Sequence, residues 1–347
     1  MNFTLKQEIK KQTPKRPFLG LLLVMVVLHL TGCSNIKPPN IDIPPMAPPP
    51  KMPKKVDVAL VLGAGGSRAL AHLGVLEVLE EEGIPIDLIV GCSAGSLMGA
   101  LYADNPNAKQ IKEKVINLKK DDLLDVSIKA SMVAPVAVQG NALEHFVVKN
   151  LAAKNFEQLK IPLVAVATNV VNNHMVLLRS GPIAPAVHAS SALPPVFAPV
   201  TLYNETLVDG GVIAPVPVQV ARLYKPRLLI AVDISSPPSK DPIANAFDLV
   251  YRSLSISFYE LSRLQTTKAD IFIHPDLKGF GTFDDKYNQE MYEIGRKAAR
   301  ASIPGIKRAL ARRGIKCHRK RHATIRHDRE KRDAALTPHR EKGTIRG

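Results

Sequence analysis

A serine between two glycines, in the stretch Val90–Ser96 (VGCSAGS), is the first candidate for chemistry. Gly91, Ser93 and Gly95 fit the pattern G-x-S-x-G, and the apolar run IDLIV ends directly before them. In a nucleophile elbow the serine has a strained backbone at a strand end, and neighbouring chains pass too close for side chains at the glycine positions. A helix that begins at such a turn stabilises the developing alkoxide through its dipole. We therefore predict that Ser93 is a nucleophile.

A glycine-rich turn, Gly63–Arg68 (GAGGSR), follows the apolar run VDVALVL. It lacks the lysine that a Walker loop requires, and Arg68 stands where a Rossmann loop has its last glycine. Unsubstituted backbone amides at the start of a helix can instead hold a transient oxyanion. Because ligands bind at the carboxyl ends of the strands in a parallel sheet, we expect this turn to lie close to Ser93.

A nucleophilic serine needs a base, and the sequence offers two arrangements. Asp209 stands after the segment TLYNETLV and before two glycines, of which Gly210 is the first, although Asp-Gly-Gly by itself is often a turn. The alternative is the chain order of α/β hydrolases, which Ser93, Asp233 and His274 satisfy. That triad would make the protein a general esterase or a thioesterase. The residues by themselves leave both bases open.

The remaining histidines, His72, His145, His174 and His188, stand in contexts typical of structural or surface residues. No Cys, His or carboxylate cluster has the spacing of metal ligands, so we expect neither a metal nor another cofactor. The three cysteines likewise do not make a disulfide framework.

Alternating strand and helix patterns extend over residues 56–313, which we assign to one domain. Short β-branched apolar runs predict strands at 56–62, 86–90, 162–171, 174–181, 201–203, 206–208, 227–235 and 270–275. Helical periodicity predicts helices at 69–83, 96–103, 241–265 and 287–303. Two strand–turn–helix units in succession predict an α/β fold whose central, mostly parallel sheet is covered by helices on both faces.

The motifs and their order resemble those of patatin-like phospholipases. The shared features are a G-x-G-G-x-R loop after the first strand, the sequence HLGVL, G-x-S-x-G, the segment ASSALPPVFAPV, and DGG followed by PVPV. The likeness covers about residues 56–235 and extends more weakly to about residue 310. It implies a three-layer α/β/α fold, a Ser93–Asp209 dyad, oxyanion-binding amides near Gly65 and Gly66, and no metal. The matching motif positions around these residues are Gly63, Arg68, Gly91, Gly95 and Gly210.

The resemblance implies a lipid acyl hydrolase of the phospholipase A or lysophospholipase type, with phospholipid or another acyl ester as substrate. Three positions, Ala69, Pro195 and Ala214, depart from the family pattern. An alanine at position 69 is tolerated if its backbone is helical, and not if it is left-handed. The segment AVHASSALPPVFAPV is expected either to line an acyl-chain groove or to belong to the core. A catalytically silent lipoprotein that binds lipid or a partner is the alternative of another class, which the presence of Ser93 and Asp209 disfavours.

The first 55 residues predict export and anchoring. A basic stretch precedes the apolar run Pro17–Leu30, which is short for a membrane span and typical of a signal peptide. The run ends in LTGC, which resembles the bacterial lipobox, so we expect a signal peptide over 1–32 and an acylated Cys33. Ser34 follows where an aspartate would retain the protein at the inner membrane, which implies the outer membrane, facing the periplasm. The proline-dense residues 33–55 are expected to form a stalk between this anchor and the domain.

The formal net charge of +16 lies at the two ends of the chain. Residues 1–55 carry 9 basic and 2 acidic side chains, and residues 312–347 carry 13 and 4, so the middle is neutral. The basic segment 314–347 lacks apolar periodicity and is expected to be disordered. Contact with an anionic lipid surface is a use that its charge allows. Nucleic-acid binding is not expected, because no aromatic residue interleaves these charges.

Overall fold

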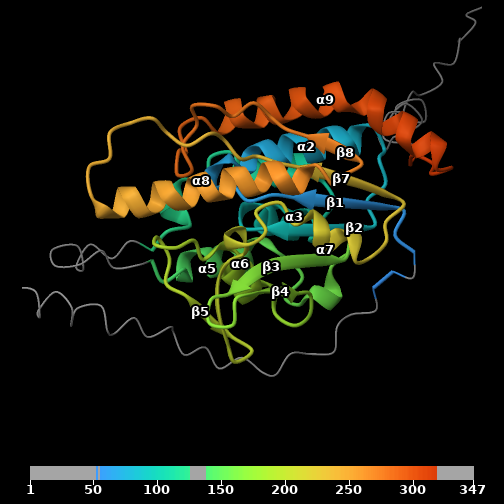
Figure 1. The fold of residues 1–347 in the computed structure, drawn as a ribbon. Coiled ribbons are helices and arrows are strands. Elements are labelled where there is room, and N and C mark those ends of the chain that lie inside the picture. The colour runs from blue at the N-terminus through green and yellow to red at the C-terminus, as the bar shows by residue number, and fades with distance from the viewer. Residues whose placement is uncertain (1–51, 54, 126–137, 319–347) are drawn as a thin grey trace, which may run out of the picture. The chain divides into compact units, whose positions relative to one another are not determined.

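Eight strands form one mixed sheet in the computed structural model, which describes residues 52–53, 55–125 and 138–318 (Figure 1). Their order is β5-β6-β3-β2-β1-β7-β8, and β4 pairs with β3. Cys33, the predicted stalk as far as residue 51 and the tail beyond residue 318 lie outside the described residues. The strands are β1 (Val58–Leu62), β2 (Leu88–Cys92), β3 (Leu163–Asn169), β4 (His174–Leu178), β5 (Val200–Leu202), β6 (Glu205–Asp209), β7 (Leu228–Val232) and β8 (Ile271–Ile273).

The middle of the sheet is parallel, and one side of it is antiparallel. Strands β3, β2, β1, β7 and β8 run parallel to their neighbours in this series, whereas β4, β5 and β6 form antiparallel pairs. All residues of β1, β2, β3 and β7 are buried, which is why these strands are near-continuous apolar runs. The predicted strands are confirmed, with shifts of a few residues at their ends.

Alternate residues of β1 pack into two separate hydrophobic clusters, so both faces of the sheet are covered. Leu60 belongs to the larger cluster and Ala59 to the smaller one. The larger cluster contains residues of α2 (Ala69–Glu81), α3 (Ala94–Asp104), α6 (Ile183–Ser191) and α9 (Asn288–Arg312). The smaller one contains residues of α7 (Val218–Arg222), beside which α8 (Ala246–Thr266) packs. The predicted α/β/α arrangement is therefore confirmed (Figure 1).

Several helical segments are not predicted by the periodicity of the sequence. Helix α6 is buried at nearly every position, so it shows no apolar stripe from which an amphipathic helix could be recognised. The others are short: α4 (Ala108–Val115), α5 (Asn141–Asn150), α7, and the 3-10 turns η1 (Gly66–Arg68), η2 (Lys120–Asp122), η4 (Phe156–Gln158) and η5 (Gly210–Val212).

Two predicted helix boundaries are wrong. Helix α8 begins at Ala246 rather than at residue 241, because the Asn245 side chain accepts a hydrogen bond from the amide of Asp248 and caps the helix there. Helix α9 continues through Pro304 to Arg312 rather than ending at residue 303. A proline inside a helix costs about 3 kcal/mol. The burial of Ile306 and Leu310 in the core beyond it offsets that cost.

The buried apolar side chains of the described residues all lie between Val56 and Ile315. The described residues also fall within one compact unit. We therefore expect residues 52–347 to fold without the segment that precedes them. Within the described part of the chain, no helix combines the length and the apolar character that a bilayer span requires.

The contact between α2 and α9 generates the first prediction. A Cβ atom on Gly295 of α9 would overlap the carbonyl oxygen of Ala71 in α2. We expect Gly295→Ala to lower the free energy of unfolding by about 1–3 kcal/mol, because the two backbones would have to separate. Gly305, which has open space around its Cα, is the matched control on the same helix. Gly305→Ala should raise the free energy of unfolding by about 0.5–1 kcal/mol, and equal effects of the two changes in urea titrations would contradict the prediction.

Candidate active site

Ser93 occupies a sharp turn between β2 and α3. Its φ of 53° and ψ of −123° are strained for a residue with a side chain. A Cβ atom on Gly91 would approach the carbonyl oxygen of Gly95 to 2.5 Å, and one on Gly95 would overlap the carbonyl oxygen of Leu62 in β1. Gly91 is therefore required by the tightness of the turn itself, and Gly95 by the close approach of β1. The turn holds the Ser93 side chain at the carboxyl end of the sheet, where it borders a cavity.

Ser190, in α6, connects this turn to β3 through two hydrogen bonds. The amide of Ser93 donates to the Ser190 hydroxyl at 3.0 Å, and that hydroxyl donates to the carbonyl of Val166 in β3 at 2.7 Å. The Ser96 hydroxyl in turn donates to the Ser93 carbonyl at 2.7 Å. Sequence reasoning missed Ser190, because a serine in an apolar segment carries no sign of the distant amide that it will meet.

Strand β3 brings Asp209 next to Ser93. Cys92, at the end of β2, pairs with Val166 of β3, and Asp209, at the end of β6, pairs with the next residue, Ala167. Strand β4 pairs with the other side of β3, so β2 and β6 share one side of β3 and meet end to end there. The side chains of Ser93 and Asp209 are hydrogen-bonded to each other.

The Asp209 carboxylate is buried and receives three hydrogen bonds. The hydroxyl of Ser93 is one donor, the amide of Gly211 is a second at 2.7 Å, and the thiol of Cys92 is a third at 3.7 Å. Burial raises the pKa of Asp209 to about 6, while the three hydrogen bonds act in the opposite direction. A carboxylate with this pKa is ionised at neutral pH and is a better proton acceptor than an exposed aspartate.

The glycine loop presents two amides that the backbone does not use. Gly65 and Gly66 donate to no backbone carbonyl among the described residues, and both border the cavity together with Ser93. Amides so placed can stabilise negative charge that develops beside the serine. The other amides of Gly63–Arg68 do have partners: Gly63 donates to Val232, Ala64 to Pro215, Ser67 to Thr282 and Arg68 to Gly65.

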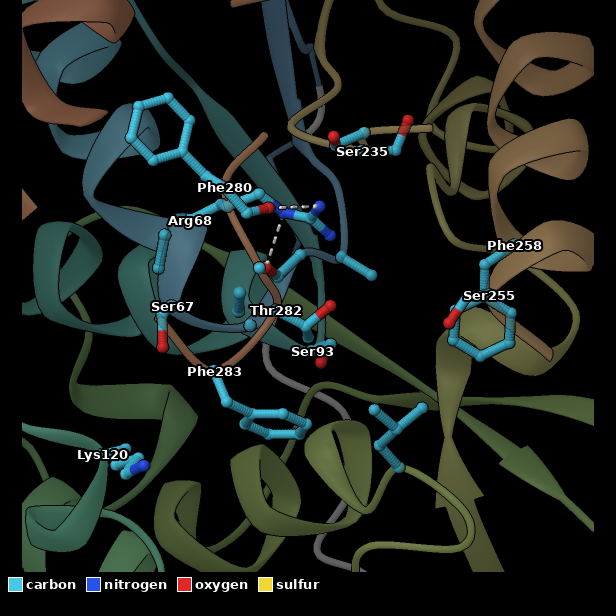
Figure 2. Close-up of a pocket in the computed structure, with 18 of the residues that line it drawn as sticks. Ser67, Arg68, Ser93, Lys120, Ser235, Ser255, Phe258, Phe280, Thr282 and Phe283 are labelled. Atoms are coloured by element: carbon cyan, nitrogen blue, oxygen red, sulfur yellow. Dashed lines mark hydrogen bonds between the residues drawn. The ribbon is translucent and has the colours of Figure 1, made fainter. Parts of the chain in front are cut away.

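Arg68 fixes the orientation of the peptide between those two glycines. Its Nε donates to the carbonyl of Gly65 at 3.1 Å and its Nη1 to the carbonyl of Phe280 at 3.4 Å (Figure 2). In a trans peptide the carbonyl and the amide point in opposite directions. The amide of Gly66 is therefore directed away from the guanidinium. Burial lowers the pKa of Arg68, and the charge of Asp233 partly offsets that effect.

The cavity beside Ser93 has a volume of about 690 Å³ and a mixed lining. In Figure 2 Ser93 lies between Phe283 on one side and Phe258 of α8 on the other. Apolar side chains extend the lining toward α3, α5 and α6, and hydroxyls and charges extend it toward the loop after β7. Only part of the segment 186–200 contributes, through Ser191, Leu193 and Phe197, whereas its remaining residues are mostly core.

The structure shows the backbone or the contacts of the three residues that depart from the family pattern. Ala69 has helical torsion angles, φ −48° and ψ −30°, so its methyl group meets the condition stated above. Pro195 follows Pro194 through a cis peptide bond. Ala214 is buried and its amide donates to the carbonyl of Gly210 at 2.7 Å.

The alternative base arrangement, Asp233 with His274, lies elsewhere. Nδ1 of His274 is 2.9 Å from the backbone carbonyl of Asp233 and 3.7 Å from its carboxylate. Both residues border a second hollow with Phe272 and Arg263, which Ser93 does not border. The structure thus brings His274 to Asp233 and does not bring either to Ser93.

The other buried histidines have structural partners. His72 contacts the Gly63 carbonyl through Nε2 at 2.8 Å, and burial lowers its pKa to about 4, so it is neutral at physiological pH. His188 pairs with Glu144 at 2.7 Å. In the part of the chain that the structure describes, no group of three His, Cys, Asp or Glu side chains is arranged to hold a metal ion.

Comparisons with known proteins match the described domain. A family model described as patatin-like phospholipase matches residues 60–222, a range that contains Gly63–Arg68, Ser93 and Asp209. Patatin-like phospholipase domain-containing protein 6 of Mus musculus is 27% identical over 280 residues, covering 72% of this chain and 20% of that protein. Lysophospholipase NTE1 of Debaryomyces hansenii is 28% identical over 266 residues, covering 69% and 17%. The chain thus spans about a fifth of the length of these relatives.

Two solved structures are also similar. VipD from Legionella pneumophila matches with a TM-score of 0.49 and 13% identity, covering 75% of this chain and 68% of that chain. ExoU from Pseudomonas aeruginosa, in complex with SpcU, matches with a TM-score of 0.41 and 14% identity, covering 75% and 53%.

The burial of Asp209 predicts a pH-dependent effect on stability. A pKa raised from 3.8 to about 6 means that the folded protein binds this proton more tightly than the unfolded chain does. The resulting stabilisation is complete below about pH 4 and is lost as the pH rises through about 6. The Asp209→Asn variant cannot ionise. Its free energy of unfolding, relative to wild type, should therefore rise by about 3 kcal/mol between about pH 4 and pH 8.

Urea titrations at several pH values measure this difference. Asp121→Asn, which changes an exposed carboxylate, is the control and should show a difference that varies little with pH. A flat difference for Asp209→Asn would mean that the carboxylate is not desolvated in the folded protein.

Proposed function

Residues 60–222 match the patatin-like phospholipase family, and from this premise we propose that the protein hydrolyses the carboxylic esters of lipids through Ser93 and Asp209. The observation that carries the proposal is that two strand ends meet at a strained turn and bring the hydroxyl of Ser93 to the buried carboxylate of Asp209. Two unused amides, those of Gly65 and Gly66, border the same cavity. Nucleophile, base and oxyanion donors are thus available in one place.

The reaction has two steps. Ser93 Oγ attacks the ester carbonyl while Asp209 accepts the hydroxyl proton, and the amides of Gly65 and Gly66 hold the negative charge of the tetrahedral intermediate. The carbon–oxygen bond of the ester then breaks, and Asp209 returns the proton to the departing alcohol. In the second step Asp209 takes a proton from water and the hydroxide adds to the carbonyl of the acyl group. The bond between the acyl carbon and Ser93 Oγ then breaks, Asp209 returns the proton to Ser93 Oγ, and a fatty acid leaves.

The lining of the cavity supports a lipid as the substrate. Its volume of about 690 Å³ lies within the usual range of small-molecule sites. The apolar part beside Leu97, Leu143 and Leu193 suits an acyl chain, and the polar part beside Ser235 and Lys240 suits a head group. The relatives named phospholipase and lysophospholipase support the same class, so we propose phospholipase A or lysophospholipase activity.

The location of the protein is a separate proposal that rests on the sequence. The signal-like segment 1–32 and the lipobox at Cys33 support a lipid-anchored protein of a bacterial cell envelope, at the outer membrane and facing the periplasm. The basic segment 314–347 would add contact with anionic lipid. Anchoring would keep the domain close to its substrate and raise the effective concentration of that substrate.

Covalent labelling and lipid release test the proposed activity. Wild-type protein should react with a fluorophosphonate probe at Ser93 and release fatty acid from phospholipid or lysophospholipid. Ser93→Ala should abolish both signals, and Asp209→Asn should reduce turnover by at least about a thousandfold, because the serine loses its base. His274→Ala is the control for the alternative triad and should retain activity. Loss of activity in His274→Ala, with activity retained in Asp209→Asn, would overturn the dyad.

The rate of hydrolysis should follow the ionisation of Asp209. Only the carboxylate can accept the proton of Ser93, so kcat/KM should fall about tenfold per pH unit below about pH 6 and be level above it. Assays of a soluble short-chain ester from pH 4.5 to 9 measure this fall in kcat/KM. The same profile in His274→Ala serves as the control. If kcat/KM no longer fell at low pH in that variant, the titration would belong to the histidine.

A further inference from the structure

Helix α8 has one face on the cavity and another face in solvent. Its cavity-lining residues recur with helical spacing, from Asp248 through Ser255 to Ser262. Of its 21 residues, only Ser262 and Thr266 are buried. The helix therefore covers the cavity without being covered itself, and in Figure 1 its N-terminal end projects past the sheet.

The uncovered face of α8 and the loop that precedes the helix carry a group of large apolar side chains. These residues, which we call the α8 patch, are between 39% and 54% exposed, and they are Ile243, Phe247, Leu249, Val250 and Ile256. The charged side chains between residues 243 and 257 are Asp248 and Arg252, and both border the cavity. Arg252 stands between Leu249 and Ile256 at helical spacing, and its Nη1 donates to the carbonyl of Asp241. A group of exposed apolar side chains of this kind indicates a binding surface.

The polar groups on this face are already satisfied within the helix. The hydroxyl of Ser253 donates to the carbonyl of Leu249 at 2.8 Å, and that of Ser257 donates to the carbonyl of Ser253 at 3.2 Å. Serines that bond to the carbonyl four residues earlier present little polarity to their surroundings. The face can therefore enter an apolar medium without leaving these hydroxyls unpaired.

Five cationic side chains outside the glycine loop border the same cavity. Asp241, Asp248 and Asp285 also border it, so the cations outnumber these carboxylates. None of the cationic side chains forms a salt bridge with a residue that the structure describes. These unpaired charges suit an anionic surface. The cations are Lys119, Lys120, Lys240, Arg252 and Lys278.

We propose that the α8 patch docks the domain on the surface of a bilayer that contains anionic lipid. The apolar side chains would enter the region between head groups and acyl chains, and the surrounding cations would contact the head groups. The choice of lipid as partner rests on the proposed function, since the same helix forms a wall of the cavity that contains Ser93. Docking on this face places the helix that forms a wall of the cavity against the layer from which a lipid must leave. This contact acts in addition to an anchor at Cys33.

Vesicle binding by residues 52–347 tests the proposal. All variants carry Ser93→Ala, so that binding is measured without hydrolysis and does not depend on the proposed activity. The test variant is Leu249→Gln with Ile256→Gln, which makes the patch polar and changes no cavity residue. The control is Val171→Gln with Leu223→Gln, which removes exposed apolar side chains that lie outside α8. Co-sedimentation with vesicles of equal parts phosphatidylcholine and phosphatidylglycerol is the assay.

The Val171→Gln/Leu223→Gln control should bind these vesicles as tightly as the Ser93→Ala parent does. The Leu249→Gln/Ile256→Gln variant should bind them at least about tenfold more weakly. In a background with Ser93 intact, the Leu249/Ile256 pair should hydrolyse vesicle lipid correspondingly more slowly and a soluble short ester at an unchanged rate. Equal vesicle binding by the two pairs would overturn the proposal. The proposal would also be overturned if the Ser93→Ala parent formed dimers in solution and only the Leu249→Gln/Ile256→Gln variant did not. The patch would then bind a second copy of the chain.

Discussion

The burial of the Asp209 carboxylate beneath the hydroxyl of Ser93 is the interaction on which the rest of this structure depends. Away from water, the carboxylate is held by donors from Ser93, Gly211 and Cys92, and its burial raises its pKa to about 6. Such a group is charged at neutral pH and still accepts a proton readily. It can be placed there only because β3 pairs with β2 along one part of its length and with β6 along the next, so that two strand ends meet.

Contacts around Ser93 stabilise the strained backbone of its turn. A serine with φ of 53° persists because other groups hold it: the amide bonds to Ser190 and the carbonyl to Ser96. Gly91 leaves room for the turn itself, and Gly95 for the close approach of β1. Arg68 makes the corresponding contribution on the glycine loop, where it holds one carbonyl of the Gly65–Gly66 pair so that the amide points the other way. These contacts come from the elbow itself, from α6 and from the glycine loop, which are separate segments of the chain.

The cavity joins that site to a helix of different character. Helix α8 contributes Phe258 and Ser255 to the cavity on one face and leaves Leu249 and Ile256 exposed on the other. A helix with only two buried residues gains less stability from packing against the core than a fully covered helix does. A lipid surface would cover its exposed apolar side chains. The polarity of the cavity, its cationic border and the exposed face of α8 are thus consistent with one another if the substrate arrives from a bilayer.

The sequence by itself determined the order of the strands, four of the helices and the elbow at Ser93. Apolar runs such as VDVALVL predict buried strands because both faces of a parallel sheet are covered, and G-x-S-x-G predicts the elbow because the turn leaves no room for side chains at its two glycines. The resemblance to a family selected Asp209, whereas the residues alone left His274 open. Only the tertiary structure placed Asp209 beside Ser93 and His274 in another hollow, because strand pairing between distant segments sets those distances. The same applies to Ser190, to the helix that passes through Pro304 and to the face that α8 exposes, since each depends on neighbours far along the chain.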